Sequence, residues 1–185
     1  MLEIFRKCKF HDAADQLYRR LVRQARDPVF YLHFGVPDTP DGRFDMIILH
    51  AFLVIRRLKA EHERTVGLAQ AIFDLMFADM DQNLREMGVG DLGVSKRIKG
   101  MAEAFYGRTA AYEEGLTGDG MLLGQALQRN LYRTTTPTRS QIEWMIGYMH
   151  HQLTALAEVP IDNFLKGEIK FAHMPNIVDG ICDES

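Results

Sequence analysis

The sequence predicts an all-α protein, folded as a single compact domain of six or seven helices. Three observations support this prediction. Apolar residues recur at helical spacing along almost the whole chain, no stretch shows strand-like alternation, and proline or glycine separates the periodic stretches. The 185 residues are 46% hydrophobic and 25% charged, which is typical of a folded globular protein. We therefore expect residues 1–185 to form one domain.

The first three expected helices cover residues 12–26, 44–61 and 64–87. Asp12 is a suitable N-cap for the first helix, and Asp27-Pro28 ends it. Residues 28–43 contain several prolines and are expected to form a loop. The second helix is apolar nearly all round in its first half, which predicts a central position. The third has an apolar stripe made of Val66, Ala69, Phe73, Met76, Met80, Leu84 and Met87.

The remaining expected helices cover residues 91–116, 121–132, 138–157 and 162–166. Gly88-Val-Gly90 stops the third helix, and Asp91 is expected to cap the fourth. Thr138 and Gln141 form a capping-box pattern at the start of the sixth helix. Pro160 ends that helix, and the acidic end after about residue 175 is expected to be loose.

The helix expected over residues 91–116 has a pattern on both faces. One face is an ordinary apolar stripe of Val94, Ile98, Met101, Phe105, Tyr112 and Leu116. The nearly opposite face has only small residues, namely Gly93, Gly100, Ala104, Gly107, Ala111 and Gly115. Glycine inside a helix costs about 1 kcal/mol relative to alanine, so this face needs an explanation. This small-residue face either packs against a neighbouring helix of the same fold or lets the backbone of a partner lie close to it.

Charge and cysteine content limit the class of protein. Residues 1–26 contain seven Lys or Arg against three Asp or Glu, whereas the remainder contains fifteen against twenty-two. A basic first helix suits contact with an anionic membrane surface or RNA, and it equally suits a solvated surface. Cys8 and Cys182 lie far apart with no signal peptide pattern, which favours a reducing compartment. The longest apolar run, residues 46–55, is too short to span a bilayer.

Three motifs match the letters of known sites but lack the required context. Gly88-Val-Gly90-Asp-Leu-Gly93 would need a preceding strand to bind a dinucleotide. Asp79, Asp81 and Asn83 resemble the start of a calcium loop, but the later loop positions do not fit, and Asp81 is expected to pair with Arg85 instead. The basic start of the 91–116 helix suggests a helix-turn-helix only weakly, so we predict no DNA binding.

No catalytic, metal-binding or cofactor-binding residues are predicted. None of the seven histidines has a metal-ligand spacing, and no serine lies in a nucleophile elbow. His50 is expected to be a hydrogen-bonded core residue. A helical enzyme of unknown substrate stays an alternative, which a polar pocket with a carboxylate beside His50, His150 or His151 would favour.

Several strings in the chain resemble one known family. They are Gln24-Ala-Arg-Asp-Pro28 with Phe30-Tyr31, Gly35-Val-Pro-Asp-Thr-Pro-Asp-Gly-Arg-Phe-Asp45, Phe77-Ala-Asp-Met-Asp-Gln-Asn-Leu-Arg-Glu-Met-Gly-Val-Gly-Asp91 and Lys99-Gly-Met-Ala-Glu-Ala-Phe-Tyr-Gly-Arg108 with Ala111-Tyr112. Over about residues 13–170 the chain resembles the ubiquinol–cytochrome c chaperone family, the assembly factors for cytochrome b of respiratory complex III. Because the chain begins directly at the domain, without a presequence, it resembles a bacterial member.

The resemblance implies a non-catalytic chaperone that binds newly made cytochrome b as its client. Mitochondrial relatives act with a small partner protein near the ribosomal tunnel exit. The expected location is the cytoplasm, with peripheral contact at the inner membrane through the basic first helix. A membrane-surface adaptor is a further alternative.

We predict partner contacts at ten residues of the family-like stretches. Gly107 would let a partner backbone approach, Tyr106 would be an amphipathic anchor, and arginines would bind carboxylates or carbonyls. The alternative is that Asp81–Arg85 and Arg108 only hold helices together. The predicted set is Arg43, Phe44, Asp45, Asp79, Asp81, Arg85, Gly100, Tyr106, Gly107 and Arg108.

Overall fold

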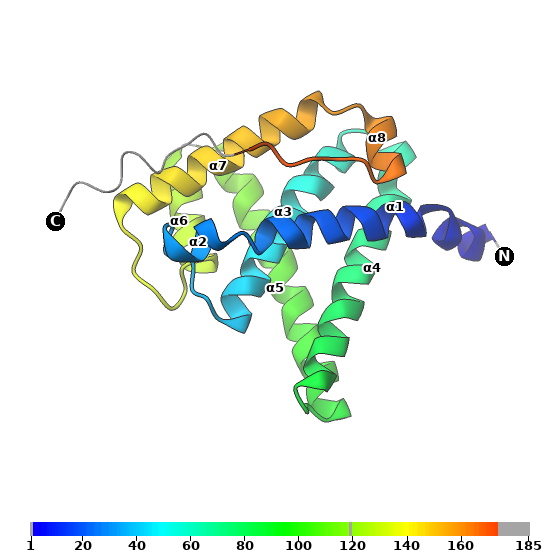
Figure 1. Cartoon of the computed structure of the whole chain (residues 1–185), viewed down its shortest axis with the longest axis horizontal. Coiled ribbons are helices and arrows are strands. Elements are labelled where there is room, and N and C mark those ends of the chain that lie inside the picture. Colours follow the sequence, from blue (N-terminus) through cyan, green and yellow to red (C-terminus); the bar gives the residue numbers. More distant parts are fainter. Residues whose placement is uncertain (1, 119, 174–185) are drawn as a thin grey trace.

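Helices account for all the regular secondary structure in the computed structural model, which describes residues 2–118 and 120–173. The all-α prediction is confirmed within that part of the chain (Figure 1). The helices are α1 (Leu2–Ala25), α2 (Pro28–Leu32), α3 (Pro40–Lys59), α4 (His62–Glu86), α5 (Asp91–Thr117), α6 (Gly120–Asn130), α7 (Arg139–Glu158) and α8 (Ile161–Lys166).

The helix α3 forms the centre of the fold. Every residue from Phe44 to Val54 is buried, as the nearly all-round apolar sequence predicts. Helices α1, α4, α5 and α7 all pack against α3. The core joins buried residues of α1, such as Leu17 and Leu21, to Met145 and Met149 of α7. A central helix without a polar face therefore organises its neighbours around itself.

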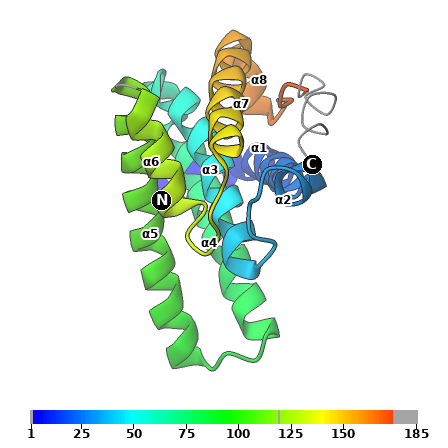
Figure 2. The same ribbon diagram turned by 90° about the vertical axis from the view of Figure 1, so that its left-hand side faces the viewer.

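The helices α4 and α5 form a long hairpin that projects from the body of the molecule (Figures 1 and 2). With 25 and 27 residues, they are about 37 and about 40 Å long at the usual helical rise. Gly88 ends α4 in a left-handed conformation, with φ +80°, which a residue with a side chain rarely adopts. The hairpin tip, residues 87–92, lies at the far end, away from α1, α3 and α7 (Figure 2).

Several predicted helix boundaries are wrong for identifiable reasons. The first helix begins at Leu2, so Asp12 lies inside α1 and is not its N-cap. Asp27-Pro28 ends α1 but also starts α2, because the Asp27 carboxylate accepts from the Val29 N–H at 3.1 Å and Pro28 takes the first helical position. Thr39-Pro40 starts α3 in the same way, four residues before the predicted start.

Of two predicted helix caps, the one at Thr138 is confirmed and the one at Asp91 is wrong. The Thr138–Gln141 capping box opens α7. Gly90 rather than Asp91 is the N-cap of α5, and the Asp91 side chain forms an ion pair with Arg85. The glycine-rich string at residues 88–93 is therefore a helix stop followed by a helix start. The predicted loose tail after residue 175 lies outside the described residues.

The small-residue face of α5 divides into two parts. Gly115 is buried, and a Cβ atom there would lie 2.6 Å from the Leu123 Cα of α6, so this end is an internal helix contact. At Gly100 and Gly107 a Cβ atom would have nothing within 4 Å, and both residues are exposed. The apolar face is in the interior, since Val94, Phe105 and Tyr112 are all buried.

Over the described residues, we find no helix with the length and apolar character needed to cross a bilayer.

The division of the α5 face predicts opposite effects of two glycine substitutions. Gly115→Ala should destabilise the protein by about 1–3 kcal/mol, because the added methyl group meets the α6 backbone. Gly107→Ala should stabilise it by about 0.5–1 kcal/mol, because alanine is the better helix residue and meets no atom. Urea unfolding of both variants checks this, and equal effects would contradict the division.

Candidate functional site

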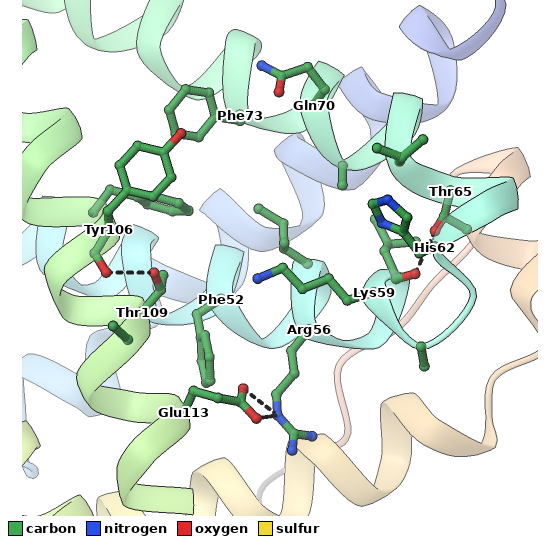
Figure 3. A pocket seen from close by; sticks show the side chains of 17 residues that line it. Phe52, Arg56, Lys59, His62, Thr65, Gln70, Phe73, Tyr106, Thr109 and Glu113 are labelled. Atoms are coloured by element: carbon green, nitrogen blue, oxygen red, sulfur yellow. Dashed lines mark hydrogen bonds and ion pairs between the residues drawn. The ribbon is translucent and has the colours of Figure 1, made fainter.

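A groove opens where the end of α3 separates the first half of α4 from the second half of α5 (Figure 3). Its volume is about 850 Å³. Most of its lining is apolar or aromatic, and the principal such side chains are Phe52, Ile55, Val66, Ala69, Phe73 and Tyr106. Tyr106 is 61% exposed and Val66 is 40% exposed, so the groove presents apolar surface to solvent. Surfaces of this kind are typical of binding sites.

The charged groups in the groove are two cations, Arg56 and Lys59, and one carboxylate, Glu113. Arg56 of α3 donates to the Glu113 carboxylate of α5 at 2.9 Å, which joins the two walls. Lys59 is exposed, has no ion pair within the described chain, and extends across the groove in Figure 3. Thr65 is buried, and its hydroxyl donates to the Leu58 carbonyl at 2.5 Å. An unpaired ammonium group in an apolar groove suits a ligand segment with an acidic side chain.

The sequence of α4 explains how apolar residues reach this groove. Its fully buried residues are Thr65, Leu68, Ile72 and Met76; the first three lie beside the predicted stripe, and Met76 belongs to it. The apolar arc of the helix is therefore wider than the arc that the core covers. The uncovered edge, with Val66, Ala69 and Phe73, lines the groove. The apolar stripe did not predict the groove, because periodicity does not distinguish an apolar edge that the core covers from an open one.

A buried ion cluster fixes α5 against α3. Asp45 Oδ1 lies 2.9 Å from Arg108 Nη2, and Asp45 Oδ2 lies 3.3 Å from Arg133 Nε. The Asp45 and Arg108 side chains are only 2% and 7% exposed. Asp45 Oδ1 and Arg108 form an ion pair without a hydrogen bond between them. Burial raises the pKa of Asp45 to about 6, although the two arginines oppose this shift.

Three of the ten predicted residues are buried, so their side chains are not accessible to a partner. Phe44, Asp45 and Arg108 lie in the interior, and the last two form the ion pair just described. For Arg108 the alternative interpretation, a tie between helices, is the one that fits. Arg43 remains on the surface, where its Nε donates to Asp38 at 2.6 Å.

The other predicted residues lie along the α4–α5 hairpin. Asp79 accepts a hydrogen bond from Tyr18 of α1 at 2.7 Å, so it holds α1 to α4. The predicted Asp81–Arg85 pair is present at 2.5 Å, and Arg85 also binds Asp91 across the hairpin turn. These residues stabilise the hairpin.

Tyr106 and Gly107 lie beside the groove, on the open part of the α5 face. The Tyr106 ring packs on Phe73 of α4, with centroids 5.6 Å apart, while most of its surface stays accessible. Gly107 follows on the exposed side, and Gly100 lies two turns nearer the tip. The structure thus places Tyr106 in the groove lining, with Gly107 next to it on the exposed face of α5.

His50 is a hydrogen-bonded core residue, as predicted. Its Nδ1 lies 2.8 Å from the Met46 carbonyl and its Nε2 lies 2.6 Å from the Tyr148 hydroxyl. Nδ1–H therefore donates to Met46 and Nε2 accepts from Tyr148. Burial lowers the pKa of His50 to about 4, which keeps the ring neutral. His150 and His151 are exposed on α7.

Within residues 2–118 and 120–173, no group of three His, Cys, Asp or Glu side chains is arranged to hold a metal ion. Asp79, Asp81 and Asn83 lie on α4, where Asn83 donates to Asp79. The calcium-like string is part of a helix.

Comparisons with known proteins give concordant matches. The profile of a family described as "Ubiquinol-cytochrome C chaperone" matches residues 32–171. The chain is 27% identical over 168 residues to ubiquinol-cytochrome c reductase complex assembly factor 1 of Mus musculus, covering 90% of this chain and 57% of that protein. It is 26% identical over 146 residues to the protein "CBP3, mitochondrial" of Saccharomyces cerevisiae, covering 77% and 44%. The chain therefore spans roughly half the length of these two relatives.

A solved structure also matches. The crystal structure of the Cbp3 homolog from Brucella abortus superposes with a TM-score of 0.79 at 36% sequence identity, and the match covers 93% of this chain and 96% of that chain.

The buried ion cluster predicts a large difference between two aspartate substitutions. Asp45→Ala should lower the free energy of unfolding by about 3–5 kcal/mol, because it leaves the Arg108 charge buried without a partner. Asp38→Ala, which removes the exposed partner of Arg43, should change it by less than about 1 kcal/mol. Chemical denaturation measures both, and a mild Asp45→Ala variant would show that the cluster does not fix α5.

Proposed function

Because the chain belongs to the ubiquinol-cytochrome C chaperone family, we propose that it is a non-catalytic assembly chaperone that binds newly made cytochrome b and assists assembly of the ubiquinol–cytochrome c reductase complex. The names of the Mus musculus and Xenopus laevis relatives, which are reductase complex assembly factors, support this role. The observation that carries the proposal is the open groove between α3, α4 and α5.

The groove suits a client that is not yet packed. A newly made membrane protein exposes apolar side chains that later become covered, and the exposed parts of Tyr106 and Val66 offer apolar surface to them. Lys59 would bind an acidic side chain of the same segment.

The open part of the α5 face extends the proposed contact beyond the groove. Gly107 and Gly100 present backbone with no neighbouring atoms, so a client backbone could lie close to the helix there. Of the residues predicted from the sequence, Tyr106, Gly107 and Gly100 stay in the proposed client surface. Arg43 stays as a peripheral candidate because it is exposed.

We also propose contacts with a small partner protein, the ribosome and the membrane surface. A small partner protein and the ribosome follow from the family resemblance, as does a cytoplasmic location beside the inner membrane of a bacterium. Peripheral membrane contact through α1 would use Arg23 and Arg26, which are exposed and have no ion pair within the described chain. Arg19 and Arg20 are less available, because they bind Asp15 and the Gly167 carbonyl.

The groove proposal predicts a strong effect of a single charge reversal. Lys59→Glu should reduce co-purification of cytochrome b with the tagged protein at least about tenfold, because it replaces attraction by repulsion at the groove. The matched control is Lys166→Glu, which reverses an equally exposed lysine on α8. Both variants should give the circular dichroism of the parent protein. Equal capture by the two variants would contradict a client site in the groove.

The assembly role itself predicts a selective defect. Deletion of the gene should lower the amount of assembled complex III and the b-type haem absorbance, while other respiratory complexes persist. Native gel electrophoresis and difference spectra of membranes measure both quantities. Normal complex III in the deletion strain would refute the assembly role.

A further inference from the structure

A stripe of exposed side chains runs along α5 from the hairpin turn to the groove. Its members are spaced alternately by four and three residues, so they keep to one side of the helix. At about 100° per residue, they fall within about 80° of one another. The stripe consists of Leu92, Lys96, Lys99, Glu103, Tyr106 and Ala110, and all six are exposed.

The fold leaves the groups of this stripe available to a partner. Leu92 is 92% exposed and Tyr106 is 61% exposed. Between them, Lys96, Lys99 and Glu103 have no ion pair within the described chain. The hairpin that carries the stripe projects from the body (Figure 2). Apolar groups at the ends of a helical face, with charges of both signs between them, suit packing against another helix.

The stripe is complementary to itself when two copies of α5 lie antiparallel. With the two-fold axis beside Met101, Lys99 of one copy lies level with Glu103 of the other, and the two charges attract. Lys96 lies level with Tyr106 of the second copy, whose ring binds a cation on its face. Two-fold symmetry repeats both contacts on the other side of the axis.

The same arrangement brings the hairpin turn of the second copy to the groove. Leu92 then lies level with Ala110, which belongs to the groove lining. Glu86 and Asp91 are exposed at that turn, and Glu86 has no ion pair within the described chain. Lys59 extends across the groove without an ion pair of its own (Figure 3). Carboxylates beside an apolar side chain therefore meet an apolar groove with an unpaired cation.

We propose that the protein forms an antiparallel homodimer through the α4–α5 hairpin, with α5 packed on α5 and the turn of each copy at the groove of the other. The two-fold arrangement closes the assembly at two copies. Tyr106 belongs to both the dimer contact and the proposed client surface, so a second copy and the client exclude each other. This exclusion rests on the proposed function, whereas the dimer itself does not.

An anionic surface fits this face less well than a second copy does. Glu86, Asp91 and Glu103 are interspersed with the cations, so a nucleic acid or an anionic membrane would meet repulsion as well as attraction. The matching partner carries the same charges in the opposite order along a helix. An antiparallel copy of α5 has that order.

The test is sedimentation equilibrium of the purified full chain, which should fit a monomer–dimer equilibrium. Lys99→Glu and Glu103→Lys should each raise the dimer dissociation constant at least about tenfold, because each change places like charges at two symmetric contacts. The double variant Lys99→Glu with Glu103→Lys should restore the wild-type constant, since both ion pairs form again with reversed polarity. Leu92→Ser should weaken the dimer several-fold without changing the charge.

Matched controls use exposed residues outside the stripe. Arg97→Glu reverses a cation of α5 that has no ion pair within the described chain and lies on another side of the helix. Leu32→Ser changes a leucine that is 75% exposed on α2. Both controls should dimerise as the wild type does, and all variants should keep the circular dichroism of the parent protein.

Three results would overturn the proposal. They are a wild type that stays monomeric at about 200 μM, a double variant that fails to restore the dimer, and an Arg97→Glu variant weakened as much as Lys99→Glu. Capture of cytochrome b is measured separately. A wild type that stays monomeric and still captures cytochrome b would overturn the dimer alone and leave the proposed function standing.

Discussion

Burial of the middle of α3, from Phe44 to Val54, is the constraint on which the rest of the structure depends. A helix with no polar face is stable only when other helices cover it on every side, and α1, α4, α5 and α7 supply that cover. The buried helix also contains a carboxylate, Asp45, whose charge must be compensated in the interior. Arg108 supplies the compensating charge, so the ion pair fixes α5 at one height beside α3. The packing of α1 and α3 against α4 holds the other arm of the hairpin.

The proposed functional surfaces lie where α3 no longer covers its neighbours. At its carboxyl end, α3 separates α4 from α5 and leaves the groove lined by Phe73, Tyr106 and Lys59. Beyond its amino end, α4 and α5 continue as a projecting hairpin (Figure 1). The open groove is the feature of this body that suits the proposed client contact.

Periodicity and capping signals predict most of this fold, because amphipathic helices leave a regular trace in the sequence. The central position of α3 and the capping box at Thr138 are examples. The short α2 was missed because Asp27-Pro28 both ends one helix and begins the next. The site was less predictable. The Asp45–Arg108 pair joins residues distant in the sequence, and no local pattern distinguishes a buried arginine from an exposed one. Likewise, Val66 and Phe73 have the spacing of an apolar stripe, and that spacing is the same for a stripe that faces the core and for one that lines an open groove.

Site-specific photo-cross-linking during synthesis of cytochrome b tests the central claim most directly. A photoreactive residue at position 106, on the lip of the groove, should form a covalent adduct with newly made cytochrome b. The same residue at position 32, equally accessible on α2, should form none. Adducts from position 32 alone, or none from either position while cytochrome b still co-purifies, would contradict a client site between α3, α4 and α5.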